Sequence, residues 1–125
     1  MRDSLASFLD DWARRGHEPA VIQRAGVRVV RWSYAELRRL AFQFARELEA
    51  HRIEKGDRVL FCGPNGAEWL AAFFGCLVRG VIVVPLDLES SREFVARVQL
   101  QVEAKLMLAG REQQGLAPTV PVVLL

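Results

Sequence analysis

The sequence holds few of the side chains on which catalysis and metal binding usually depend. Its 125 residues include two cysteines, two histidines and one tyrosine. Cys62 and Cys76 lie inside apolar runs, so they are interpreted as buried thiols of a protein in a reduced, cytoplasmic compartment. His17 and His51 have no cysteine or carboxylate at ligand spacing. We therefore predict neither a disulfide framework nor a metal site.

Charge of one sign is also lacking. The net charge is +2, with 26% charged and 51% hydrophobic residues, which is typical of one globular unit. No basic stripe is interleaved with aromatic residues, so arginine-rich stretches are interpreted as solvated helix faces and no nucleic-acid partner is predicted. The N-terminus carries acidic residues and no apolar core, so it is not a signal peptide.

One apolar run, Trp69 to Leu86, is about long enough to cross a bilayer. Arg79 and Gly80 interrupt it near the middle, however, and a glycine at this place ends a helix. The β-branched stretch VIVVPL follows. The run is therefore predicted to be a buried helix and then a buried strand, and no membrane span is expected.

Local patterns predict the elements in the first part of the chain. Apolar spacing predicts a helix over 4–15, and two β-rich pieces, 20–24 and 27–32, predict a hairpin that turns at Ala25-Gly26. A second helix is predicted from Ser33, which forms a capping box with Glu36. Two further helix starts show the same spacing, and they are Asn65 with Glu68 and Ser90 with Glu93.

Four apolar stretches follow the second helix or separate the later helices, and they are RVLFCG, VIVVPL, KLMLA and TVPVVLL. Strands that are apolar throughout are buried on both faces, which is typical of parallel sheets. The predicted fold class is therefore α/β, a mostly parallel sheet with helices on both faces (βαβ units), preceded by an N-terminal helix and a β-hairpin. Because the last strand ends at Leu125 without a cover, residues 1–125 are expected to form a single domain, a partial N-terminal subdomain of a longer enzyme.

The loop in FCGPNGAEW, residues 61–69, raises the main functional question, because phosphate loops occur at strand-to-helix turns. Its spacing is G-P-N-G, which matches neither G-x-G-x-x-G nor a Walker motif. Asn65 and Glu68 are predicted to cap the next helix, with Pro64 and Trp69 packed across its start. The loop is therefore predicted to turn the chain and not to hold a phosphate.

Three stretches, in this order, resemble the AMP-forming acyl-CoA synthetase (acyl-adenylate-forming, ANL) family in its N-terminal region. WSYAEL is similar to the first core motif of the family. GDRVLFCGPNGAEWLAAFFGCLVRG is similar to its strand, Pro-Asn turn and helix, and LVRGVIVVPLD is similar to its second core motif. The opening FLDDWARR and the stretch VIVVPLD resemble bacterial fatty-acyl-CoA ligases.

The resemblance implies a parent enzyme that uses ATP and Mg²⁺ to turn a carboxylic acid, such as a fatty acid, into an acyl-adenylate, and then forms a thioester with coenzyme A. The family's Ser/Thr/Gly-rich loop that ends in lysine is absent from the 125 residues. The matching residues have scaffold roles: Ser33 caps a helix, Gly80 reverses the chain and Pro85 ends a strand. We therefore assign no catalytic, cofactor-binding or metal-binding residue to this chain, which is not expected to be active alone.

Two other readings of the sequence stay open. The chain could be a free-standing nucleotide- or CoA-binding module that uses the loop at Gly63, because helix N-termini attract anions. It could instead be a structural domain that docks a partner along the apolar strand that ends at Leu125, because unpaired strand edges invite association.

Overall fold

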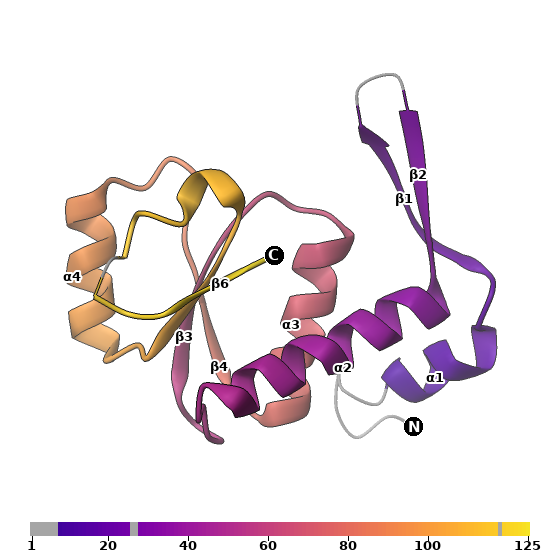
Figure 1. The fold of residues 1–125 in the computed structure, drawn as a ribbon, viewed down its shortest axis with the longest axis horizontal. Coiled ribbons are helices and arrows are strands. Elements are labelled where there is room, and N and C mark those ends of the chain that lie inside the picture. Colours follow the sequence, from indigo (N-terminus) through magenta and orange to yellow (C-terminus); the bar gives the residue numbers. More distant parts are fainter. Residues whose placement is uncertain (1–7, 26–27, 118) are drawn as a thin grey trace.

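The computed structural model describes residues 8–25, 28–117 and 119–125 (Figure 1). The elements, in chain order, are α1 (Phe8–Arg15), β1 (Pro19–Ala25), β2 (Arg28–Ser33), α2 (Tyr34–Ala50), β3 (Arg58–Cys62), α3 (Ala67–Arg79), β4 (Ile82–Pro85), α4 (Arg92–Val102), β5 (Leu106–Ala109), the 3₁₀ turn η2 (Arg111–Gln113) and β6 (Val122–Leu124). The order matches the sequence prediction. Residues 4–7 of the predicted first helix and Gly26 of the predicted turn lie outside the described residues.

The first elements form a unit at the N-terminal end of α2. β1 and β2 pair antiparallel, which confirms the predicted hairpin. α1 packs against α2, and the ring of Trp12 meets Phe74 of α3 edge-on with the ring centroids 4.7 Å apart. Because α2 runs from the hairpin to the sheet, it joins the two parts of the molecule (Figure 1).

The second part is a four-stranded sheet in the order β4-β3-β5-β6, and every pair of neighbours is parallel. Leu60 of β3 lies opposite Val84 on one side and Met107 on the other. β5 is buried along its whole length and β3 from its second residue on, as their continuous apolar runs predicted. The prediction that the apolar runs of β4 and β6 are buried strands is wrong: both strands lie at the edges of the sheet and are only partly buried.

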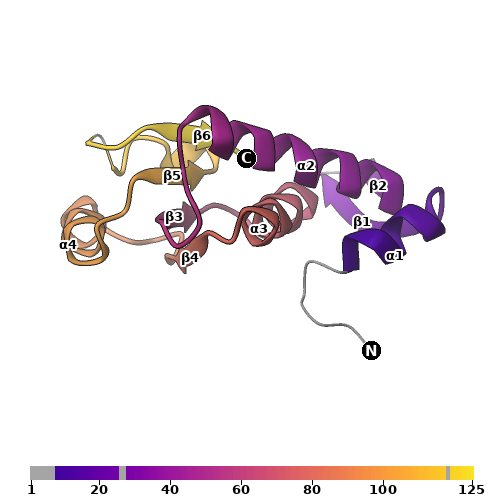
Figure 2. The same ribbon diagram turned by 90° about the horizontal axis from the view of Figure 1, so that it is seen from below.

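Helices cover both faces of this sheet, as predicted, and they create two hydrophobic cores. α2 and α3 lie on one face and α4 lies on the other (Figure 2). Alternate residues of β3 divide between the cores: Val59 and Phe61 pack with α2 and α3, whereas Leu60 and Cys62 pack with Val95 of α4. The sheet is thus the middle layer of three.

The start of α2 confirms the predicted capping box. The Glu36 N–H donates to Ser33 Oγ at 3.1 Å, and the Ser33 N–H donates to Glu36 Oε1 at 3.3 Å. These bonds satisfy two groups that an uncapped helix leaves without partners. Leu37, four residues after the cap, is fully buried.

The predicted start of α4 is wrong by one residue. The N-cap is Ser91, whose Oγ accepts from the Phe94 N–H at 3.1 Å. The Ser90 N–H instead donates to the Asp87 carbonyl at 3.0 Å and closes the preceding turn. Two adjacent serines offer the same cap, and the turn selects the second one.

The apolar run from Trp69 divides as predicted. α3 ends at Arg79, and Gly80 caps it in the left-handed conformation, with φ of 69°. β4 then begins at Ile82. Among the described helices, none combines the length and the apolarity that a bilayer crossing requires.

Candidate functional site

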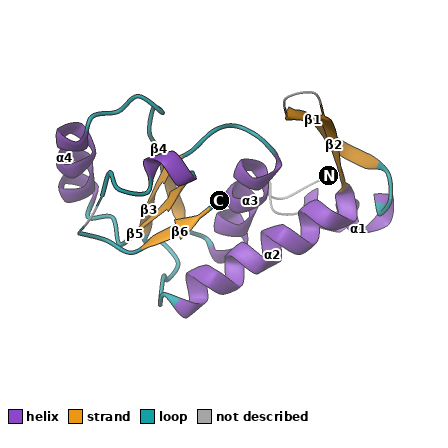
Figure 3. Cartoon of the chain, turned by 45° about the horizontal axis from the view of Figure 1, so that its top comes forward, coloured by secondary structure: helices purple, strands orange, loops and turns teal. Residues whose placement is uncertain are grey.

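The carboxyl edge of the sheet is the first place to look for a site, because open α/β sheets bind ligands there, where strand order reverses. The chain passes from β3 to β4 on one side and returns to β5 on the other side of β3. The loops after β3 and β5 therefore meet at this edge, and they begin at Gly63 and Gly110 (Figure 3).

The crevice between these loops is filled by the protein itself. The Gly110 N–H donates to the Cys62 carbonyl at 3.0 Å, and the Leu125 N–H donates to the Ala109 carbonyl at 2.9 Å. A Cβ added at Gly63 would lie 2.9 Å from the Gly110 nitrogen and would collide with Leu125 Cδ1. A gap that cannot accept a methyl group cannot hold a phosphate between Gly63 and Gly110.

The predicted cap of α3 is wrong. Gly66 is the N-cap, in an extended conformation, and it has no side chain that could make a capping hydrogen bond. Asn65 is exposed and lies one residue before the cap, so Asn65 and Glu68 do not form a capping box. The close packing at Gly63 and the acidic Glu68 in the first turn of α3 therefore disfavour a phosphate in this loop, and side-chain caps play no part.

A small hollow of about 420 Å³ lies beside this loop. Arg111 and Glu112 contribute opposite charges to it, next to Pro64, Leu88 and Gln113. Because the acid offsets the one arginine, the hollow lacks the dense positive charge that a triphosphate requires.

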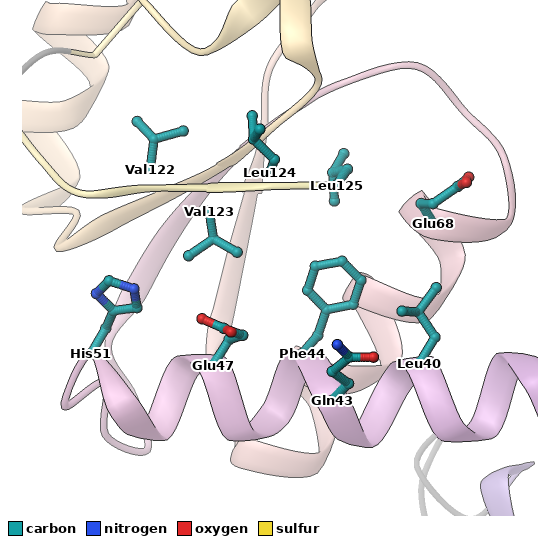
Figure 4. A pocket seen from close by; sticks show the side chains of 10 residues that line it. All are labelled: Leu40, Gln43, Phe44, Glu47, His51, Glu68, Val122, Val123, Leu124 and Leu125. Atoms are coloured by element: carbon teal, nitrogen blue, oxygen red, sulfur yellow. The ribbon is translucent and has the colours of Figure 1, made fainter.

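A second concavity, of about 460 Å³, lies between α2, the start of α3 and β6. We call it the β6 groove. Val123 and Leu125 face α2, whereas Phe44 points from α2 toward the strand (Figure 4). Glu47, His51 and Glu68 place polar groups at its margins. The β6 groove therefore has an apolar floor along an edge strand, and its composition is typical of a surface against which another segment packs.

The cysteines occupy the two cores, as predicted, and both are free thiols. Burial raises the pKa of Cys76 to about 12. Burial, and then the negative charge of Asp87, raise the pKa of Cys62. A raised pKa lowers the thiolate fraction at neutral pH, so neither thiol is a nucleophile there.

The two histidines lie at different places in the fold. His17 is exposed in the turn after α1, and His51 caps the carboxyl end of α2. Across the described ranges, no three His, Cys, Asp or Glu residues gather as a metal would require. No step of catalysis is assigned to these residues.

Comparisons with known proteins agree with this picture. The sequence model of one family, described as AMP-binding enzyme, matches residues 8–124. The long-chain-fatty-acid–CoA ligase FadD13 of Mycobacterium tuberculosis is 32% identical over 94 residues, which is 75% of this chain and 18% of that protein. The mitochondrial acyl-coenzyme A synthetase ACSM3 of Pongo abelii is 37% identical over 86 residues, 62% of this chain and 14% of that protein.

Solved structures share the fold. The crystal structure of IdnL1 superposes with a TM-score of 0.86 at 27% identity and covers 100% of this chain and 26% of that one. The chain thus spans less than a fifth of the two relatives named above. The family match over nearly the whole chain, together with this fold, leads to one conclusion: the chain belongs to the family of AMP-binding, adenylate-forming enzymes and corresponds to a part of their N-terminal region.

Proposed function

We propose that this chain is the N-terminal scaffold of an ATP-dependent, AMP-forming acyl-CoA ligase. In the parent enzyme, a carboxylate oxygen attacks the α-phosphorus of ATP, and pyrophosphate leaves. The sulfur of coenzyme A then attacks the acyl carbon and AMP leaves. The match to the long-chain-fatty-acid–CoA ligase FadD13 over three quarters of the chain is the observation that carries this proposal, and it favours a fatty acid as the substrate.

The chain's own part is structural. ATP, Mg²⁺ and coenzyme A bind to segments of the parent outside these 125 residues, because the carboxyl edge at Gly63 is closed and the described carboxylates do not cluster. The parent is proposed to work in the cytoplasm.

The β6 groove is proposed to receive the remainder of the parent. Leu124 on its edge strand is 46% exposed, and among the described strands β6 has a neighbour on one side only. An edge with unpaired backbone groups and apolar side chains favours pairing with a further segment. The relatives supply several times as much chain to cover it.

A chimaera tests the proposal. The 94-residue stretch of FadD13 that matches this chain is replaced by the corresponding residues of the chain, and fatty-acid-dependent exchange of pyrophosphate with ATP is measured. We expect exchange to be retained. As a control, the chimaera with Leu37→Asp should be inactive, because a charge at this fully buried position disrupts the core. A folded chimaera without exchange contradicts the proposal, and circular dichroism and thermal melting establish folding.

A further inference from the structure

The outer face of α2 carries a stripe of cationic and aromatic side chains. Arg38, Phe42 and Arg46 follow one another at intervals of four, and Arg39 lies beside them, so all four share one face. This face is opposite to the one that Leu37 and the other buried residues of α2 turn toward the core. Together with α1, the stripe encloses a hollow of about 600 Å³, lined by Ala13, Ala35, Arg38, Arg39, Phe42 and Arg46. We call it the arginine hollow.

No acidic residue is among the residues that line the arginine hollow. The ion pairs found within the described part of the chain join Arg14 to Asp11, Arg15 to Glu18 and Lys105 to Asp57, and none of them includes a lining arginine. The acids nearest in sequence to the lining residues are Asp11 on α1 and Glu36 and Glu47 on α2, and none of them lines the hollow.

Arg38 provides an independent sign of a missing acceptor. Its Nε atom is buried and has no hydrogen-bond partner among the residues that the structure describes. The guanidinium carbon lies 4.9 Å from the centre of the Phe42 ring, and this contact restricts the orientation of the guanidinium group. A buried N–H without an acceptor is unfavourable, and an oxygen-bearing anion in the hollow would supply the acceptor.

We propose that the arginine hollow binds a phosphate group. Guanidinium groups hold phosphate oxygens through paired, charge-assisted hydrogen bonds, and three of them line one concavity here. The volume exceeds what a phosphate or pyrophosphate needs. The phosphate group is either that of a free anion or that of a lipid headgroup, and the chemistry of recognition is the same.

This site is separate from the surfaces described above. None of its lining residues belongs to the β6 groove or to the hollow beside Gly63. Binding at the arginine hollow therefore does not depend on the proposed ligase activity, and it can be measured on the chain itself.

The test has two arms. In the first, sodium pyrophosphate is titrated into the chain in a calorimeter at low and at physiological ionic strength. In the second, the chain is sedimented with phosphatidylcholine vesicles that either contain or lack phosphatidylglycerol. Both arms use the chain, the variant with Arg38→Gln, Arg39→Gln and Arg46→Gln, and a matched variant with Arg31→Gln, Arg92→Gln and Arg97→Gln, which loses the same charge elsewhere.

We expect binding in at least one arm, weaker at higher salt, because exposed charges are screened. The variant of the hollow should bind at least about tenfold more weakly, whereas the matched variant should stay within about twofold of the chain. Binding of pyrophosphate identifies a free anion, and binding only to vesicles with phosphatidylglycerol identifies a headgroup. Absence of binding in both arms, or equal loss in the two variants, overturns the proposal, and circular dichroism verifies that both variants are folded.

Discussion

Ser33 and Asn65 show what a single capping residue contributes. Ser33 Oγ accepts from a helix N–H and so stabilises the start of α2, whereas Asn65 lies outside α3 and caps nothing. We expect Ser33→Ala to lower the free energy of unfolding by about 0.5–2 kcal/mol. Asn65→Ala, the control, should change it by less than about 0.5 kcal/mol. Urea denaturation measures both values, and similar losses at the two positions would contradict this assignment.

The sequence was sufficient to predict that Ser33 caps a helix, but it was not sufficient to show that Asn65 does not. Both residues have a glutamate three positions on, and both precede an apolar periodic stretch. The difference arises from Gly66, which lies between Asn65 and the helix and takes the extended conformation of the cap itself. Which residue becomes the N-cap depends on the position of the loop, and the packing of β3 and β5 determines that position. Local sequence spacing does not encode it.

Among the elements, α2 and α3 pack closely against each other, and this contact holds the helix layer on one face of the sheet. Gly75 of α3 lies against the backbone of α2: a Cβ placed there would be 2.7 Å from the Ala41 carbonyl oxygen and 2.9 Å from Phe44 Cβ. The absence of a side chain therefore allows the two helices to approach closely, with Ala45 also at the contact.

We expect Gly75→Ala to destabilise the chain. Alanine favours a helix by about 1 kcal/mol relative to glycine, but overpacking costs about 1–3 kcal/mol, and the second effect is the larger. The expected net loss in the free energy of unfolding is about 1 kcal/mol, measured by urea denaturation. Gly115→Ala is the control, because its Cβ would find its nearest neighbour, an Arg92 side-chain nitrogen, at 4.0 Å. A gain in stability for Gly75→Ala would show that the helices do not touch there.

The elements themselves could be predicted, because each depends on local periodicity. The apolar runs of β3 and β5 indicated burial on both faces, and Gly80 indicated the end of α3. The β6 groove and the arginine hollow could not be predicted, since each joins residues distant in the chain. The arginines of α2 were interpreted as a solvated face. Their four-residue spacing was the available signal, but α1 forms part of the hollow, and its position follows from the tertiary structure.

The whole molecule is proposed to act as a scaffold. The chain supplies a three-layer α/β unit of an adenylate-forming family and presents the β6 groove as a packing surface. The loop at Gly63 resembles a phosphate loop in sequence position, but the backbone of Gly110 and the side chain of Leu125 fill the space. The extent of the unit as a single domain over 1–125, and the absence of catalytic residues from it, stay predictions.

We propose that this chain is a structural part of a ligase and performs none of its chemistry. The most direct measurement is carboxylate-dependent exchange of radiolabelled pyrophosphate into ATP by the purified 125-residue chain, with Mg²⁺ and a panel of fatty acids. We predict no exchange above the protein-free blank, because Gly110 and Leu125 close the edge of the sheet at Gly63 and the arginine hollow lies apart from that edge. Exchange that requires both the chain and a carboxylic acid would contradict it.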